Sequence, residues 1–173
     1  MFSGAENLVR HRQPEEAHSP LPYVVEVEGL PNLLHEMVHV LLVGELRKDH
    51  GTDLSQLPFA LDSSGGRLLL WQEFACCSVS AGWHPGSTAE AHDWFREQIE
   101  IQPWFFGHEE QPARFFRRVD ELLKADLSWM ETERSAHDLL AQALEDQGAC
   151  CRPPRTEGLA EFWRSYRALD SQS

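Results

Sequence analysis

The sequence predicts a mainly α fold that forms a single domain with one short strand or hairpin. The 173 residues suit one domain, and 42% of them are hydrophobic, which is enough for one sizeable core. Apolar residues recur at helical spacing along most of the chain. Only one short segment is rich in β-branched residues. No internal repeat is visible, so we expect residues 23–173 to form one helical domain.

Residues 1–22 are expected to be a flexible N-terminal segment. This stretch contains three prolines and several charged residues, and it has no apolar block of the kind found in a signal peptide. We therefore expect a cytoplasmic protein. The next segment, Tyr23 to Val27, is apolar and β-branched and predicts a strand that Gly29 and Pro31 end.

Two apolar helices are predicted next, with an irregular segment from residue 53 to 67 between them. The first runs from Asn32 to Lys48, with apolar residues at helical spacing. The second runs from Leu68 to Ser80 and carries so little charge that we expect it to be buried.

The second half of the chain predicts four more helices from their start signals. Ser87 and Glu90 have capping-box spacing and open a helix that runs to about Ile101. Three further starts are expected, at Pro112, at the capping-box match Ser128 and at Thr156. Gly148 is the expected stop of the helix that begins at Ser128.

The charge composition limits the classes of partner. The formal net charge of −13 argues against nucleic acid, because phosphate binding relies on clustered Lys and Arg. It permits a protein or peptide substrate, possibly a basic one. No apolar run approaches the roughly 20 residues that a membrane span needs, so no membrane partner is expected. The oligomeric state is open.

Four cysteines occur as two adjacent pairs, Cys76-Cys77 and Cys150-Cys151. Neither pair has the two-residue gap of a zinc knuckle or a redox motif. We expect the first pair to act as small buried apolar residues in a reducing compartment.

The chemical signal in the sequence is the stretch His35-Glu36-Met37-Val38-His39. Residues four apart on a helix lie on one face, about 6 Å apart along the axis, so both imidazoles can reach one metal ion. Glu36 can lie near a metal-bound water and accept its proton. The alternative is two core histidines that are satisfied by hydrogen bonds.

A third ligand is needed, and Glu73 is the candidate. It is the lone acidic residue of the second apolar helix, where a carboxylate must be paired, protonated or bound to a metal. The alternative is an acidic residue at an exposed edge, or one paired with Arg67 or Arg96. The metalloprotease class that uses a third His is excluded, because the positions it requires are Leu42 and Glu45 here.

Other residues are weaker candidates for a part in the metal site. Glu45 faces partly away on the same helix, and two residues after it could line a pocket, namely His50 and Asp53. Three others could orient a ligand ring, namely His84, His92 and Asp93. Each of these is expected to be an ordinary surface residue.

The motif His35-Glu36-x-x-His39, with Glu73 in a Glu-Phe-Ala-Cys context, resembles the site of gluzincin-type zincins. The resemblance implies a zincin-like helical core in which His35, His39 and Glu73 bind zinc and Glu36 is the general base of peptide hydrolysis. Zincin peptidases place an edge strand and further sheet before the motif helix, and only about 30 residues precede His35 here.

A second resemblance is to the bacterial elongation factor P hydroxylase family. It rests on Leu34-His35-Glu36-x-x-His39 followed by Gly44, and on the segment from Gln111 to Phe115. The proline-rich segment of that family around its third ligand is absent. This resemblance implies non-haem iron and hydroxylation of a lysine side chain, and two His with one carboxylate are the ligand set of such sites.

The sequence thus favours a metal-dependent hydrolase that uses Zn²⁺, with catalytic Glu36 and the ligands His35, His39 and Glu73. An Fe²⁺-dependent protein hydroxylase is the alternative. A metal-stabilised interaction protein without catalysis is the third hypothesis.

Overall fold

The computed structural model of the chain describes residues 8–11, 23–26, 29–43, 58–148, 153 and 155–170. The predicted fold class is confirmed: the described residues form a mainly helical, single compact domain. A hairpin of two short strands precedes the helices, β1 (Leu8–His11) and β2 (Tyr23–Glu26). None of the described helices is both long and apolar enough to pass through a membrane.

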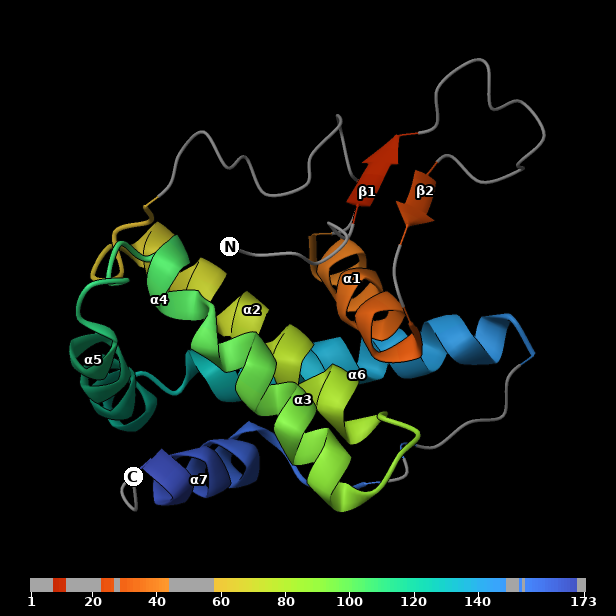
Figure 1. Cartoon of the computed structure of the whole chain (residues 1–173). Helices are drawn as coiled ribbons and strands as arrows, with labels where there is room; N and C mark the ends of the chain where they lie inside the picture. The colour runs from red at the N-terminus through yellow and green to blue at the C-terminus, as the bar shows by residue number, and fades with distance from the viewer. Residues whose placement is uncertain are drawn as a thin grey trace.

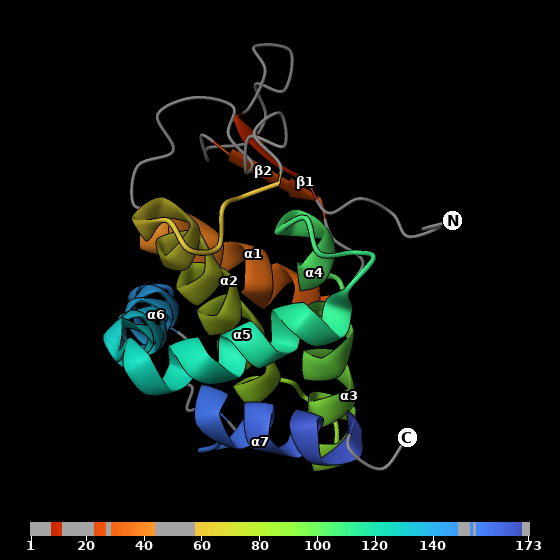
Figure 2. The ribbon, with the colours of Figure 1, turned by 90° about the vertical axis from the view of Figure 1, so that its left-hand side faces the viewer.

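Helix α2 (Ser64–Gly82) is the centre of the arrangement (Figures 1 and 2). Around it lie α1 (Leu30–Val43), α3 (Thr88–Glu100), α6 (Ser128–Asp146) and α7 (Leu159–Asp170), all of which contact it. Two further helices complete the set, α4 (Gln102–Phe105) and α5 (Pro112–Ala125). The expected burial of the charge-poor helix is therefore confirmed.

Two apolar clusters explain why α2 carries so little charge. The larger cluster packs α2 residues such as Phe74 against α3, α5 and α7. The smaller cluster joins Leu34 and Val38 of α1 to Val79 of α2 and Leu140 of α6. Since α2 is covered on both sides, it needs apolar residues nearly all round rather than on one stripe.

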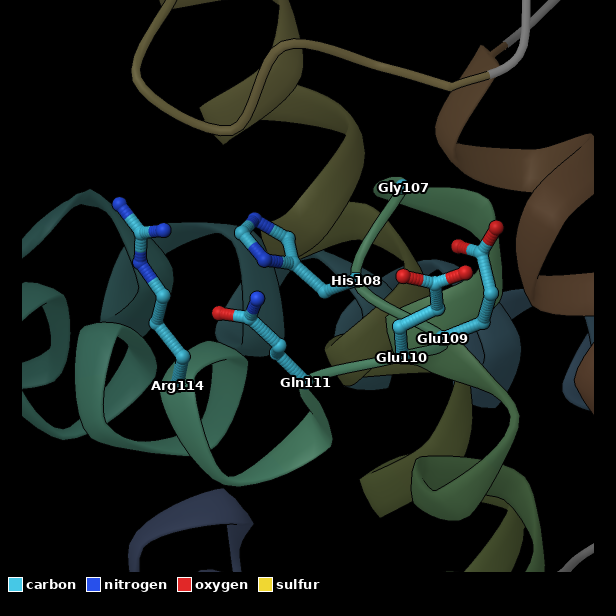
Figure 3. A pocket seen from close by; sticks show the side chains of 6 residues that line it. All are labelled: Gly107, His108, Glu109, Glu110, Gln111 and Arg114. Carbon is cyan, nitrogen blue, oxygen red and sulfur yellow. The ribbon is translucent and has the colours of Figure 1, made fainter.

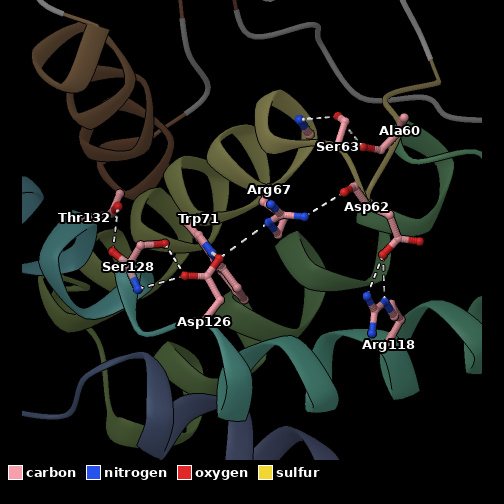
Figure 4. Close-up of polar contacts among 10 residues, drawn as sticks. Ala60, Asp62, Ser63, Arg67, Trp71, Arg118, Asp126, Ser128 and Thr132 are labelled. Carbon is pink, nitrogen blue, oxygen red and sulfur yellow. Dashed lines mark hydrogen bonds and ion pairs between the residues drawn. The ribbon is translucent and has the colours of Figure 1, made fainter.

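Helix α2 begins at Ser64, earlier than the predicted start at Leu68. The prediction was late because two glycines in the first turn, Gly65 and Gly66, indicate irregular structure. Ser63 caps the helix by accepting a hydrogen bond from the Gly66 backbone at 2.9 Å, and its hydroxyl donates to the Ala60 carbonyl at 2.7 Å (Figure 4). A Cβ atom at Gly66 would lie 2.0 Å from the Ala60 oxygen, so only glycine fits there.

The starts predicted at Ser87 and Pro112 are confirmed. Ser87 and Glu90 form a complete capping box, and Pro112 occupies the first turn of α5. Helix α4 was not predicted, because a four-residue helix has no apolar periodicity to reveal it.

The start predicted at Ser128 is confirmed, and the start predicted at Thr156 is wrong. Helix α6 begins at Ser128, but that residue does not form the predicted capping box. Instead, the Asp126 carboxylate accepts bonds from the Ser128 backbone at 3.0 Å and hydroxyl at 2.6 Å (Figure 4). Helix α7 begins at Leu159, whose backbone donates to Glu133 of α6, so a partner from another helix replaces the local cap. Gly148 follows the end of α6 with φ of 77°, as its predicted role requires.

The N-terminal segment differs from the expectation for residues 1–22. Residues 8–11 form β1, which pairs antiparallel with β2 so that Leu8 faces Glu26. Four residues are too few to show the alternation that predicts a strand. The remaining residues of that segment lie outside the described residues.

Candidate metal centre

Helix α1 brings the two histidines of the motif onto one face. The Nε2 atoms of His35 and His39 lie 3.1 Å apart, with their ring centroids separated by 4.8 Å. Leu34 and Val38, which flank them in the sequence, are buried and anchor α1 against α2 and α6. The predicted helix thus aims both imidazoles toward α2.

Helix α2 supplies Glu73 to the same point. One carboxylate oxygen, Oε1, lies 3.4 Å from His35 Nε2, and the other, Oε2, lies 3.1 Å from His39 Nε2. The alternative pairings considered for Glu73 are not formed: Arg67 pairs with Asp126, and Arg96 pairs with Asp93. The three residues singled out as ligands therefore lie together.

The separations between the donor atoms match those around one metal ion. Donors about 2.0–2.1 Å from an ion lie about 3.3 Å apart in tetrahedral geometry and about 3.0 Å apart at right angles. The two imidazole nitrogens lie 3.1 Å apart, and each lies near a different oxygen of Glu73: His39 Nε2 is 3.1 Å from Oε2 and His35 Nε2 is 3.4 Å from Oε1. One ion could contact all three side chains with shifts of only a few tenths of an ångström.

The three candidate ligands differ in their exposure to solvent. The side chain of His35 is 6% exposed, whereas those of His39 and Glu73 are 28% and 22% exposed. His35 Nδ1 is buried and has no hydrogen-bond partner among the described residues. The centre is thus closed on the His35 side and reaches solvent beside His39.

The charges of the centre are strongly coupled. Burial by itself would raise the pKa of Glu73, but the charge of His39 and hydrogen bonds from both histidines hold that pKa well below its usual range. Burial would lower the pKa of His39, but the neighbouring Cys76 and Glu73 raise it well above 6.5. The carboxylate and the imidazoles thus influence one another strongly at the place where an ion would bind.

Cys76 and Cys77 belong to the surroundings of this centre, although the sequence suggested only apolar packing. Both are free and fully buried. Cys77 Sγ lies 4.0 Å from Glu73 Oε1, and it falls within 4.8 Å of donor atoms of both Glu73 and His35. Their spacing of three and four residues from Glu73 places them on its helix face, which was the signal available in the sequence.

The thiols are protonated in this environment. Burial raises the pKa of Cys77 well above 9, and Glu73 adds to the effect. Burial also raises the pKa of Cys76, although His39 opposes the rise. A fully buried, protonated Cys76 is a poor nucleophile, so its proximity to His39 does not make a thiol–imidazole catalytic pair.

Gln102 is a further residue of the centre that sequence reasoning missed. Its side chain is fully buried, and Nε2 donates to Glu73 Oε1 at 3.0 Å and to the Gln98 carbonyl at 3.0 Å. It comes from α4, the short helix that the sequence did not reveal.

Glu36 follows His35 on α1 and is partly buried. Its charge raises the pKa of Cys76, though by less than burial and Glu73 do. Among the described residues, no hydrogen bond or ion pair holds this carboxylate in place.

The weaker candidates lie in other surroundings or outside the described residues. His84 Nδ1 accepts a bond from the Gly86 backbone, His92 pairs with Glu157, and Asp93 pairs with Arg96. Three more candidates are not among the described residues, namely Glu45, His50 and Asp53.

A surface hollow of about 250 Å³ lies between α4 and α5, away from the ligand residues. In Figure 3 the side chains of His108, Gln111 and Arg114 lie on one side of it and those of Glu109 and Glu110 on the other. The lining includes neither histidine of the motif nor Glu73. Its charged groups project from an exposed loop and do not converge on one point.

Comparisons with protein-family models, with curated proteins and with solved structures find nothing that matches this chain.

Proposed function

We propose that this chain is a single-metal hydrolase in which His35, His39 and Glu73 bind Zn²⁺. The observation that supports the proposal is the convergence of three donor side chains from two helices, with separations of 3.1 to 3.4 Å, although Glu73 lies 34 positions after His39 in the sequence. A bound zinc ion would supply Lewis-acid chemistry, lowering the pKa of a coordinated water and polarising a carbonyl group.

In this proposal Glu36 is the group that moves the proton. It accepts a proton from the attacking water and returns it to the leaving amine, so that no net charge is left on the protein. Its partial burial, and the lack of a hydrogen bond or ion pair to it among the described residues, suit a carboxylate that must move between two positions. His39 and Glu73 face solvent more than His35 does, so the substrate would approach from their side.

The substrate class follows from charge. A chain with a net charge of −13 attracts cationic partners, so we propose a protein or peptide substrate that carries Lys or Arg. The two buried thiols near the centre are free, as expected in a reducing compartment, and we therefore propose a cytoplasmic location.

One observation favours a second candidate, an Fe²⁺-dependent protein hydroxylase. Zincin peptidases align an extended substrate along the edge of a larger sheet, whereas the described residues that precede the motif helix form only a two-stranded hairpin. Two His and one carboxylate on one side of an ion also suit non-haem iron.

The test is the metal content of protein purified without chelator, measured by mass spectrometry, together with the variant Glu36→Gln. We expect one zinc per chain in both proteins, cleavage of Lys- and Arg-rich reporter peptides by the unmodified protein, and loss of that cleavage in Glu36→Gln. Glu97→Gln, on the exposed surface of α3, is the matched control and should retain cleavage.

Each alternative has its own outcome. Iron in place of zinc would support the hydroxylase, and zinc with no turnover in any protein would support a structural site. Loss of metal in Glu36→Gln would contradict the proton-transfer role, and a protein that binds neither metal would overturn the proposal.

A further inference from the structure

Gln102 contacts the candidate ligand Glu73 but has no part in the proposed chemistry. Its side chain is fully buried where α4 begins. Nε2 donates to two acceptors, Glu73 Oε1 and the Gln98 carbonyl, each at 3.0 Å. A primary amide has two N–H donors, so both are used.

These two bonds fix the orientation of the amide. In the opposite orientation the amide oxygen would face a carboxylate and a carbonyl, both acceptors, at hydrogen-bond distance. That contact would be repulsive, because it would set an acceptor oxygen against two acceptors with no proton between them. Gln102 can therefore only donate to Glu73.

The two oxygens of Glu73 consequently differ. Oε1 receives the Gln102 amide at 3.0 Å, with Cys77 Sγ at 4.0 Å on the same oxygen. Oε2 lies 3.1 Å from His39 Nε2 and receives neither of these donors. An N–H directed at Oε1 competes with a cation for its electron pairs, whereas Oε2 stays available.

We propose that Gln102 is a positioning residue that restricts Glu73 to one ligand oxygen, Oε2, and thereby keeps one coordination position open for water or substrate. The inference rests on the proposed metal site and deepens it. With two imidazoles and one carboxylate oxygen, the protein supplies three donors, and a tetrahedral ion retains a fourth position. A carboxylate that bound through both oxygens would raise the coordination number and crowd the position that water or substrate needs.

The test uses Co²⁺ as a spectroscopic substitute for zinc in the full-length chain. Visible d–d absorption of Co²⁺ is intense in four-coordinate sites and weakens as the coordination number rises. We expect intense bands in the unmodified protein and bands several-fold weaker in Gln102→Met, because Oε1 is released to the metal. Co²⁺ affinity should fall about tenfold, the lower end of the usual effect of losing a partner of a ligand.

A control and a second variant keep the test decisive. Gln98→Met is the control. Gln98 contacts Gln102 through its backbone carbonyl, so replacing its side chain should leave both the Co²⁺ spectrum and the Co²⁺ affinity unchanged. Gln102→Leu also removes the donor at similar size, so it should show the same weakened bands and the same lower Co²⁺ affinity. A readout from Gln102→Leu remains if Gln102→Met does not fold.

Failure of this inference is distinct from failure of the proposed function. An unmodified protein with four-coordinate Co²⁺ and a Gln102 variant with the same spectrum and affinity would overturn the positioning role alone. An unmodified protein that binds no Co²⁺ would overturn the metal site and this inference together.

Discussion

At the scale of single residues, Glu73 determines the character of the centre. Its carboxylate is the acceptor for both imidazoles, for the Gln102 amide and for the Cys77 thiol. Without it, two histidine rings on one helix would face each other across 3.1 Å with no anionic partner between the helices. Two histidines alone bind a metal ion weakly, so the carboxylate contributes both charge and the third donor.

Glu73→Ala is expected to weaken zinc affinity at least tenfold, because the substitution removes one of three donors. Competition titration with a chromophoric chelator measures the affinity. The matched control is Glu97→Ala on the exposed surface of α3, which should bind zinc as the unmodified protein does. Equal affinities in the two variants would mean that another residue is the third ligand.

The residues of the centre were predictable to the extent that helix geometry determines them. His35 and His39 share a face in any helix, and Glu73 was identified because an acidic residue inside an apolar helix needs a partner. Cys76 and Cys77 could have been found by the same geometry. Gln102 could not, because its position depends on how α4 packs against α2, which no local pattern encodes.

At the scale of elements, the start of α2 depends on one of two adjacent glycines. A Cβ at Gly66 would lie 2.0 Å from the Ala60 carbonyl oxygen, whereas a Cβ at Gly65 would meet nothing within 4 Å. Since backbone cannot yield as a flexible side chain can, Gly66→Ala must displace either the loop or the first turn of the helix that carries Glu73.

We therefore expect Gly66→Ala to lower the free energy of unfolding by about 2 kcal/mol or more. Gly65→Ala should leave it unchanged or raise it by up to about 1 kcal/mol, since alanine is the better helix former. Urea denaturation of both variants measures the difference. A Gly66→Ala protein as stable as Gly65→Ala would show that the loop before α2 adapts without cost.

Asp126 links α2 to the junction of α5 and α6. It accepts bonds from Ser128 and from the Trp71 indole, which is 3.0 Å away, and it pairs with Arg67 (Figure 4). The Ser128 hydroxyl and the Trp71 indole hold the pKa of Asp126 below its usual value, against a smaller opposing effect of burial. The carboxylate therefore stabilises the fold in its ionised form.

Asp126→Asn is expected to cost about 1 kcal/mol of unfolding free energy at neutral pH. Folding lowers the pKa of Asp126 below its unfolded-state value of about 3.9. The stability that the ionised carboxylate contributes is therefore complete above about pH 3.9. It is lost as the pH falls through the lower pKa of the folded state. The difference between the two proteins should thus shrink below about pH 4. Urea denaturation from pH 7 to pH 2 measures it, with the exposed Asp138→Asn as control. A constant difference across this range would contradict the assignment.

Element type was more predictable than element ends. The apolar spacing of α1 and α2 identified both helices, and the capping box at Ser87 located the start of α3. The start of α6 at Ser128 was also located, although Asp126, two residues earlier, holds it in place of the expected capping box. The start of α7 depends on Glu133 of another helix, so sequence alone placed it incorrectly.

At the scale of the whole molecule, the candidate ligands connect α1 to the central helix α2. Helix α1 packs through the smaller apolar cluster against α2 and α6, whereas α3, α5 and α7 surround α2 through the larger cluster. Two ligands come from α1 and the third from α2. An ion would therefore tie the N-terminal helix to the centre of the domain.

Zinc is expected to raise the thermal midpoint of the protein, and a chelator is expected to reverse the change. Binding to the folded state alone stabilises it by about 2.7 kcal/mol when the free metal is 100 times the dissociation constant. Differential scanning fluorimetry with and without zinc measures the shift. His39→Ala should abolish it, and His84→Ala, which alters a histidine outside the centre, should retain it. A zinc shift that survives in His39→Ala would locate the binding site elsewhere.

The way α1 is attached has a consequence for the chain inside a cell. Its main contacts are to two helices, while α2 keeps an independent set of neighbours on its other side. If the proposed site holds an ion in the cell, its loss would leave α1 held mainly by the smaller apolar cluster, so α1 is the element expected to open first and to expose its apolar side to proteases.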